Sequence, residues 1–162
     1  NPHDVAAGLG YILASVVQRQ CEERAARNKK IFWVTVNPKP TMKFTDLKYL
    51  IDKFMKRSSV KNGAYTFEIR GEERGVYHGY HAHMLFDKAS NIAPSQIHRE
   101  LSKLFKDNVI YKAIDVRVYN HGLRSDKIAY LEGTKWDDDK QESIEATRRW
   151  RKSQKLDDYY TT

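Results

Sequence analysis

Apolar residues along the chain recur with two different periods, which predict an alternation of strands and helices. Residues 31–37 (IFWVTVN) are β-branched and aromatic and are followed by Pro38, a composition typical of a strand. Residues 113–119 (AIDVRVY) alternate apolar with polar side chains, as expected of a strand with one buried face. Two further strands are predicted at 64–70 and 80–86, joined by a polar connection that contains three glycines.

The other apolar residues recur at three- and four-residue spacing, which predicts helices between the strands. The expected helices run from Asp4 to about Arg27, from Thr45 through a stripe that ends at Phe54, from Pro94 to Phe105, from about Ser125 to Glu132, and from Asp137 to about Lys155 in a charged tail. The resulting order, α-β-α-β-β-α-β-α-α, predicts an α+β fold in which helices pack on one face of a central antiparallel sheet.

Length and composition indicate one ordered globular domain. The 162 residues contain no internal repeat or flexible linker, and 40% of them are hydrophobic. We therefore expect a single domain over 1–162, with its core at about 31–136, an N-terminal helix before it and the charged tail after it. The chain begins at Asn1 without an initiator methionine or a signal pattern, so we expect an excised piece of a longer protein. No apolar run approaches the ~18 residues of a membrane span, and the single cysteine, Cys21, cannot form an internal disulfide.

The positive charge of the chain favours a polyanionic partner, chiefly nucleic acid. The formal net charge is +8, and basic residues are concentrated between positions 39 and 61. The candidate contacts to a DNA backbone are Lys39, Lys43, Lys48, Lys53, Lys56, Arg57 and Lys61, together with Arg117 of the alternating strand. The alternative for this set is an ordinary solvated helix face.

Two histidines form a candidate metal site. His81 and His83 are two residues apart on a predicted strand, so their side chains project from one face of the sheet. Imidazole is a common ligand of divalent metals, and a carboxylate would add an oxygen ligand and negative charge. Glu68 and Glu72 of the preceding strand have the same parity, so spacing does not separate them. In the alternative interpretation the two histidines are exposed and bind nothing.

Tyr130 is a candidate nucleophile because of the lysines around it. Lys127 lies one helical turn before it and Lys135 follows shortly after it. Nearby ammonium groups favour the phenolate and so strengthen a tyrosine as a nucleophile. The alternative is that Tyr130 only packs its helix against the sheet, beside Ile128 and Leu131.

Three segments resemble, in order, the three motifs of HUH replication initiators, the Rep proteins of circular single-stranded DNA viruses and rolling-circle plasmids. They are FWVTVNP (32–38), FEIRGEERGVYHGYHAHMLF (67–86) and DKIAYLEGTKW (126–136), and GYHAHMLF is the most specific part. The resemblance covers about residues 31–136. It implies a ferredoxin/RRM-like HUH endonuclease fold, with His81, His83 and one glutamate as ligands of Mg²⁺ or Mn²⁺ and with Tyr130 as the nucleophile.

The resemblance implies an endonuclease that nicks single-stranded origin DNA, at a stem-loop, leaves a covalent 5′-phosphotyrosine link and a free 3′-hydroxyl, and can rejoin strands. The third motif of viral members is Y-x-x-K, whereas Gly133 stands three residues after Tyr130 here. The assisting lysine would therefore be Lys127 or Lys135. Such a protein would act in the nucleus or cytoplasm of its host rather than be secreted. It would not bind a membrane, and it would form any homo-oligomer through regions outside this chain.

Other functions remain open at this stage. An HUH transposase or relaxase would make the same nick, a non-catalytic basic module would only bind nucleic acid, and a small metal-dependent hydrolase would need neither Tyr130 nor the positive charge. No G-x-x-x-x-G-K-[ST] phosphate loop occurs, which excludes a helicase motor of that type within these residues.

Overall fold

A computed structural model describes residues 2–133 and 141–162 of the chain. The helices and strands are α1 (Pro2–Asn28), β1 (Lys30–Val36), α2 (Phe44–Met55), β2 (Ala64–Ile69), β3 (Glu72–Glu73), β4 (Val76–Tyr77), β5 (Tyr80–Lys88), α3 (Pro94–Phe105), β6 (Ile114–Asn120), α4 (Arg124–Leu131), α5 (Gln141–Ser153) and β7 (Tyr160–Thr161). This order confirms the predicted α+β fold. Short strands β3, β4 and β7 are additions that the sequence pattern did not predict.

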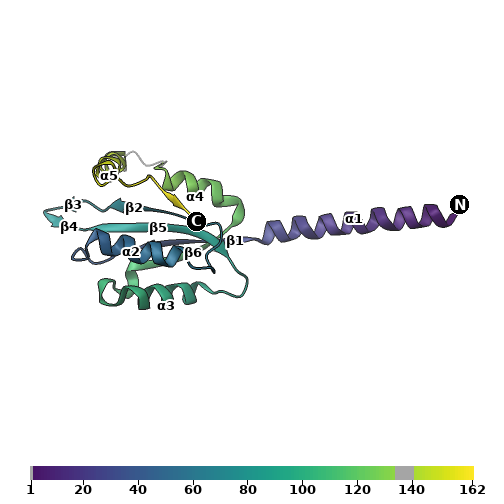
Figure 1. Cartoon of the computed structure of the whole chain (residues 1–162), viewed down its shortest axis with the longest axis horizontal. Coiled ribbons are helices and arrows are strands. Elements are labelled where there is room, and N and C mark those ends of the chain that lie inside the picture. Colours follow the sequence, from purple (N-terminus) through teal and green to yellow (C-terminus); the bar gives the residue numbers. More distant parts are fainter. Residues whose placement is uncertain (1, 134–140) are drawn as a thin grey trace.

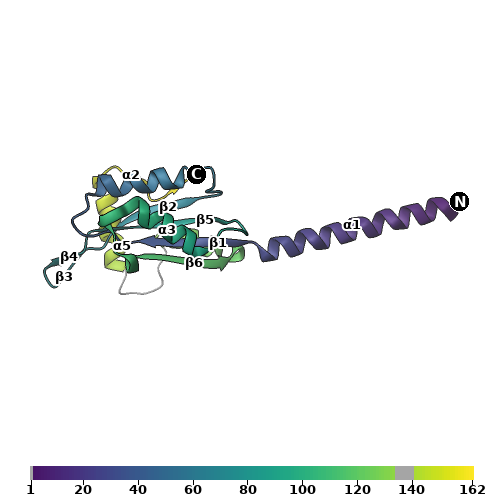
Figure 2. The ribbon, with the colours of Figure 1, turned by 90° about the horizontal axis from the view of Figure 1, so that it is seen from below.

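The central sheet has five strands in the order β6-β1-β5-β2-β7, and all neighbouring strands are antiparallel. Strand β5 lies in the middle, between β1 and β2. Its register places His83 opposite Thr35 of β1 and His81 opposite Glu68 of β2. The polar connection between β2 and β5 contains a separate two-stranded ribbon, β3-β4, that extends beyond the sheet (Figure 2).

Helices cover both faces of the sheet, so the prediction that they pack on one face was wrong. Helices α2 and α3 lie on one side, and α4 and α5 lie on the other (Figure 1). The α2–α3 side holds the larger core, which includes the fully buried Met84 of β5. Because Ile31 and Leu85 are also fully buried on the other face of the sheet, that face needs a cover of its own, which Leu131 of α4 helps to provide. Strands buried on both faces carry consecutive apolar residues, as the sequences around 31–34 and 84–86 do.

Helix α1 extends away from the domain as a single rod (Figures 1 and 2). It confirms the predicted N-terminal helix, but most of its described large apolar side chains are exposed to solvent rather than packed. Those exposed by more than half are Val5, Leu9, Tyr11, Ile12, Leu13 and Val17. Among the described residues, no helix combines the length and apolar character needed to cross a membrane.

The charged tail folds back onto the domain. Helix α5 buries Ile144, Thr147 and Arg151, and it packs beside β2. After it, β7 adds a fifth strand to the outer edge of β2 through Tyr160 and Thr161. The predicted tail helix is confirmed from residue 141 onward, and its first residues, 137–140, lie outside the described part. The last segment of the chain is therefore structural.

Candidate metal centre and tyrosine

The three side chains of the candidate metal site come from two neighbouring strands. His81 and His83 alternate along β5 with the core residues Ala82 and Met84, so both imidazoles project from the α4 side of the sheet. Glu68 of β2 is the register partner of His81 and shares this face. Strand pairing therefore brings the three groups together without any loop being involved.

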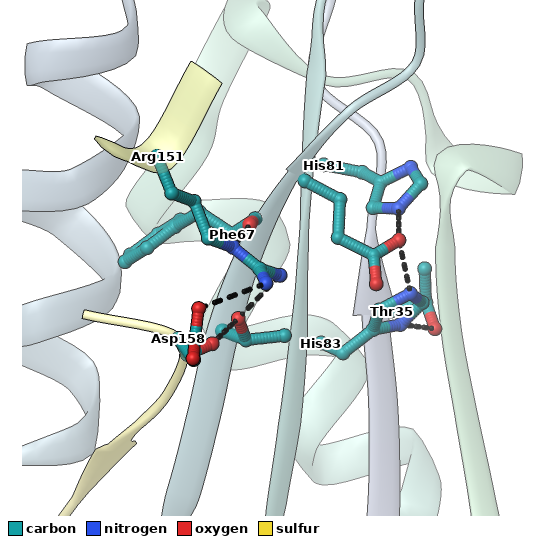
Figure 3. Close-up of polar contacts among 8 residues, drawn as sticks. Thr35, Phe67, His81, His83, Arg151 and Asp158 are labelled. Carbon is teal, nitrogen blue, oxygen red and sulfur yellow. Dashed lines mark hydrogen bonds and ion pairs between the residues drawn. The ribbon is translucent and has the colours of Figure 1, made fainter. Parts of the chain in front are cut away.

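The donor atoms of this cluster converge. Nε2 of His81 lies 2.6 Å from Oε2 of Glu68, and Nε2 of His83 lies 3.5 Å from the same oxygen (Figure 3). One ligand atom from each residue falls within 4.8 Å of the others. Two imidazole nitrogens and one carboxylate oxygen at this spacing are a donor set that can hold a divalent metal ion. Glu68 is thus the glutamate of the cluster. Glu72, the alternative, belongs to β3 in the separate ribbon, and its side chain lies outside the described part.

The cluster is largely withdrawn from water. Glu68 and His83 are 5% and 7% exposed, whereas His81 is half-buried. Burial by itself raises the pKa of the Glu68 carboxyl, but hydrogen bonds from His81 and His83, and their positive charge when protonated, hold that pKa well below its usual range. The carboxyl is therefore ionised, as a metal ligand must be.

His83 is fixed from two sides by residues of β1. Its Nδ1 lies 2.9 Å from Oγ1 of Thr35. The ring of Trp33 stacks on the imidazole, with centroids 5.3 Å apart and planes 15° apart. If Nδ1 carries the proton and donates it to Thr35, the lone pair of Nε2 points toward Glu68 and is available to a metal.

Tyr130 of α4 lies at the same site. Its ring meets the rings of His83 and Trp33 edge-on, at centroid distances of 5.6 Å in both cases. Tyr130, Glu68, His81 and His83 all line one open hollow of about 250 Å³, which Ser143 of α5 also borders. The predicted nucleophile and the predicted ligands therefore share a surface. The packing alternative for Tyr130 is also partly right, since its ring covers Trp33.

Of the two lysines predicted to assist Tyr130, the structure describes one. Nζ of Lys127 lies 4.4 Å from the ring centroid of Tyr119 and 5.2 Å from that of Trp33. Lys127 and Tyr130 thus contact the same indole, one turn apart on α4. Lys135 lies outside the described residues.

Most of the predicted DNA-contacting residues are not brought to this site. Lys43, Lys48, Lys53, Lys56, Arg57 and Lys61 lie on or beside α2, which covers the opposite face of the sheet. Lys48 pairs with Asp52 at 2.6 Å, and Arg57 pairs with Glu100 at 3.6 Å. Lys39, in the loop after β1, instead lines a second hollow together with Arg70, which also lines the hollow of the candidate metal cluster. Arg117 is exposed and pairs with Asp115 of the same strand at 2.7 Å.

Arg151 is a buried cation that the sequence pattern did not predict as part of the site. It is 4% exposed, and its guanidinium donates to the carbonyl oxygen of Phe67 at 2.9 Å and to Oγ1 of Thr66 at 2.8 Å (Figure 3). Burial lowers the pKa of Arg151 below its usual range, although the negative charges of Glu68 and Asp158 act in the opposite direction. Arg151 therefore ties α5 to the segment of β2 that immediately precedes Glu68.

Comparisons with known proteins do not indicate a function for the site, so its interpretation rests on its geometry. No protein-family model matches the chain, and no curated protein matches it. A comparison with solved structures finds an uncharacterized conserved protein from Listeria innocua, at 6% sequence identity and a TM-score of 0.24, covering 78% of this chain and 70% of that one. A similarity at this level carries no argument about fold or function.

Proposed function

We propose that this chain is a metal-assisted, single-stranded DNA endonuclease of the HUH replication-initiator type. The observation that carries the proposal is the shared hollow, in which Tyr130 lies beside the cluster of Glu68, His81 and His83. A buried metal cluster alone would suit many hydrolases. A phenol beside it suits the particular reaction in which a tyrosine becomes covalently attached to a phosphate.

The cluster would hold Mg²⁺ or Mn²⁺. When bound, such a cation offsets negative charge on the oxygens of the scissile phosphate. The protein's own residues orient the reaction. Thr35 and Trp33 fix the ring of His83, and the edge-on contact with Trp33 fixes the ring of Tyr130. A phosphate within the hollow would then lie within reach of the phenol of Tyr130.

In the proposed reaction, Oη of Tyr130 attacks the phosphorus in line with the 3′ oxygen of the upstream nucleotide. The bond between Tyr130 and phosphorus forms as the bond from phosphorus to that 3′ oxygen breaks. The phenolic proton passes to solvent, and the leaving oxygen takes up a proton, which leaves a 3′-hydroxyl. The phosphotyrosine bond retains the energy of the phosphodiester, so the hydroxyl can reverse the step.

Lys127 is the described candidate for assisting Tyr130. Its ammonium and the ring of Tyr130 contact the same indole of Trp33, and the two residues lie one turn apart on α4. Lys135 is the alternative for this role.

The direct test is trapping of the covalent adduct. The protein would be incubated with a random-sequence library of single-stranded oligonucleotides and Mn²⁺, and the products would be separated on denaturing gels. We expect the wild type to form an adduct that chelation by EDTA prevents, and mass spectrometry to place the nucleotide on Tyr130. Tyr130→Phe should form none.

The matched control is Tyr49→Phe. Tyr49 is 65% exposed on α2, on the other face of the sheet, and its replacement should leave the adduct unchanged. An adduct that persists in Tyr130→Phe would refute the assignment. Binding of the library without any adduct would favour a non-catalytic nucleic-acid-binding module instead.

A further inference from the structure

A second hollow adjoins the candidate metal centre. It has a volume of about 340 Å³, and its lining includes Pro38, Lys39, Pro40, Arg70, Ile110 and Lys112. Arg70 lines both this hollow and the one that contains the metal ligands. The two hollows therefore meet at one residue, Arg70, and a chain-like ligand could occupy both of them.

The walls of the second hollow are held together by main-chain contacts. The amide of Asn37 donates to the carbonyl of Ala113 at 2.9 Å, and the amide of Lys39 donates to the carbonyl of Asn108 at 2.7 Å. These bonds join the loop after β1 to the segment that precedes β6. On another side, a Cβ placed on Gly79 would lie only 3.1 Å from Cα of Pro40, so the glycine allows the connection into β5 to approach this loop closely.

The chemistry of the lining matches one nucleotide of a single strand. Lys39, Arg70 and Lys112 are exposed cations that can pair with phosphate oxygens. Pro38 and Pro40 supply apolar surface, and Ile110, which is 59% exposed, adds a large apolar side chain where a base could lie. A positively charged groove that follows the sugar-phosphate backbone is one part of how proteins bind single-stranded nucleic acid.

The position of the second hollow relative to Tyr130 indicates the direction in which a bound DNA strand would run. Tyr130 lies over Trp33 and His83, whereas the second hollow begins at Asn37. Asn37 directly follows β1 and is four residues from Trp33, which is about 13 Å along an extended backbone. Thr35, the partner of His83, lies between them on the same strand. The metal ligands are therefore flanked by the phenol on one side and by the second hollow on the other.

We propose that the second hollow binds the nucleotide on the 5′ side of the scissile phosphate, the one that departs with the free 3′-hydroxyl. This inference rests on the proposed function. In-line displacement places the leaving oxygen opposite the attacking one, so a phosphate attacked by Tyr130 has its leaving nucleotide on the side of the second hollow. Arg70, at the boundary, contacts the phosphate between the two sites. Lys39 and Lys112 contact the phosphate of the leaving strand.

The joining step tests this assignment, because it requires the leaving strand to rebind. The covalent adduct would first be formed with an oligonucleotide selected from the library. A short acceptor that ends in the leaving strand's own 3′-hydroxyl sequence would then be titrated, and the rate of joining measured. We expect Lys39→Ala and Lys112→Ala each to raise the half-saturating acceptor concentration about fivefold. The salt dependence of that concentration should also weaken, by about 0.7 in the logarithmic slope for each lysine removed.

The control is Lys103→Ala, which removes an exposed lysine of α3 on the far face of the sheet and should change neither quantity. Thermal unfolding would confirm that the three variants are folded. The assignment is wrong if Lys39→Ala and Lys112→Ala reach half-saturation at the wild-type acceptor concentration. It is also wrong if the size of their defect depends on the length of the DNA strand attached to Tyr130. In either case the proposed function stands. If the wild type forms no adduct with any member of the library, both fail.

Discussion

The ring of Tyr130 meets the ring of His83 edge-on, with centroids 5.6 Å apart and planes at 80°. The indole of Trp33 contacts both rings, stacked on His83 and edge-on to Tyr130. Tyr130 of α4 and the candidate ligand His83 of β5 are thus both positioned by Trp33 of β1. The orientation of the phenol and that of the imidazole are therefore coupled.

Trp33 should support both stability and the reaction. It is 6% exposed, so Trp33→Ala leaves a large cavity and should lower the free energy of unfolding by about 3 kcal/mol. Trp33→Phe keeps an aromatic ring and should recover much of that loss. Urea denaturation measures the stability, and adduct formation at a temperature where both variants are folded measures the reaction. If Trp33→Ala formed adduct at the wild-type rate, Trp33 would not position Tyr130.

Glu68 should be essential for metal binding. Glu68→Gln keeps the shape of the side chain but removes its charge, so we expect the dissociation constant for Mn²⁺ to rise at least about a hundredfold in calorimetric titrations. In the wild type, Mn²⁺ at a hundred times its dissociation constant should stabilise the fold by about 2.7 kcal/mol. Glu100→Gln, on α3 across the sheet, is the control and should behave as the wild type. An unchanged affinity in Glu68→Gln would show that the metal, if any, binds elsewhere.

Thr35 should act on metal binding through His83. Thr35→Val preserves the branched shape but removes the hydroxyl 2.9 Å from Nδ1 of His83, so Nδ1 loses its hydrogen-bond partner. We expect the affinity for Mn²⁺ to fall about tenfold, because partners that orient a ligating histidine contribute effects of this size. Thr35→Ser, which retains the hydroxyl, should keep most of the affinity. Equal affinities of the valine and serine variants would contradict this role.

Arg151 should be a major source of stability. Its replacement by methionine leaves the carbonyl of Phe67 and the hydroxyl of Thr66 without their buried donor, and should cost about 3 kcal/mol. Arg149→Met changes an exposed arginine of the same helix and should cost little. Urea denaturation of the two variants makes the comparison. Similar midpoints would show that the anchoring of α5 to β2 contributes nothing.

Deprotonation of Tyr65 should lower the free energy of unfolding at alkaline pH. Burial, with the hydrogen bond that its hydroxyl donates to Asp52 at 2.7 Å and the charge of that carboxylate, raises the pKa of Tyr65 above its usual range. The folded state therefore holds the phenolic proton more tightly than the unfolded chain does. The stabilisation is present below a pH of about 10 and is lost as the pH rises through the titration range of the folded state. Urea midpoints measured from pH 8 to 11 should fall less steeply in Tyr65→Phe than in Tyr49→Phe. Equal slopes would contradict the prediction.

The sequence predicts the part of the site that depends on local periodicity. His81 and His83 share a face because a strand repeats every two residues, and the structure confirms this. The choice of Glu68 over Glu72 could not be predicted, because the two have the same parity and only the end of β2 and the register with β5 separate them. The proximity of Tyr130 to His83 depends on how α4 packs over Trp33, which is a tertiary contact.

Two other features could be recognised only in the folded structure. Basic residues between 39 and 61 are close in sequence, yet most of them lie on or beside α2, on the face of the sheet opposite the candidate metal ligands. Lys39 instead lines the hollow that shares Arg70 with the cluster. Arg151 gives no local signal, because a helix-prone charged segment does not reveal which of its cations becomes buried. The apolar residues of the second sheet face, such as Ile31 and Leu85, are visible in the sequence and indicate helices on both sides of the sheet.

The bond from Arg151 to the carbonyl of Phe67 joins residues 84 positions apart. A ribosome making this chain completes Glu68, His81 and His83 before it reaches Arg151, which fastens β2, the strand of Glu68. Until then the nascent polypeptide carries all three candidate ligands but lacks the residue that anchors the strand of Glu68, so we expect the cluster to reach its final arrangement only after α5 has been made.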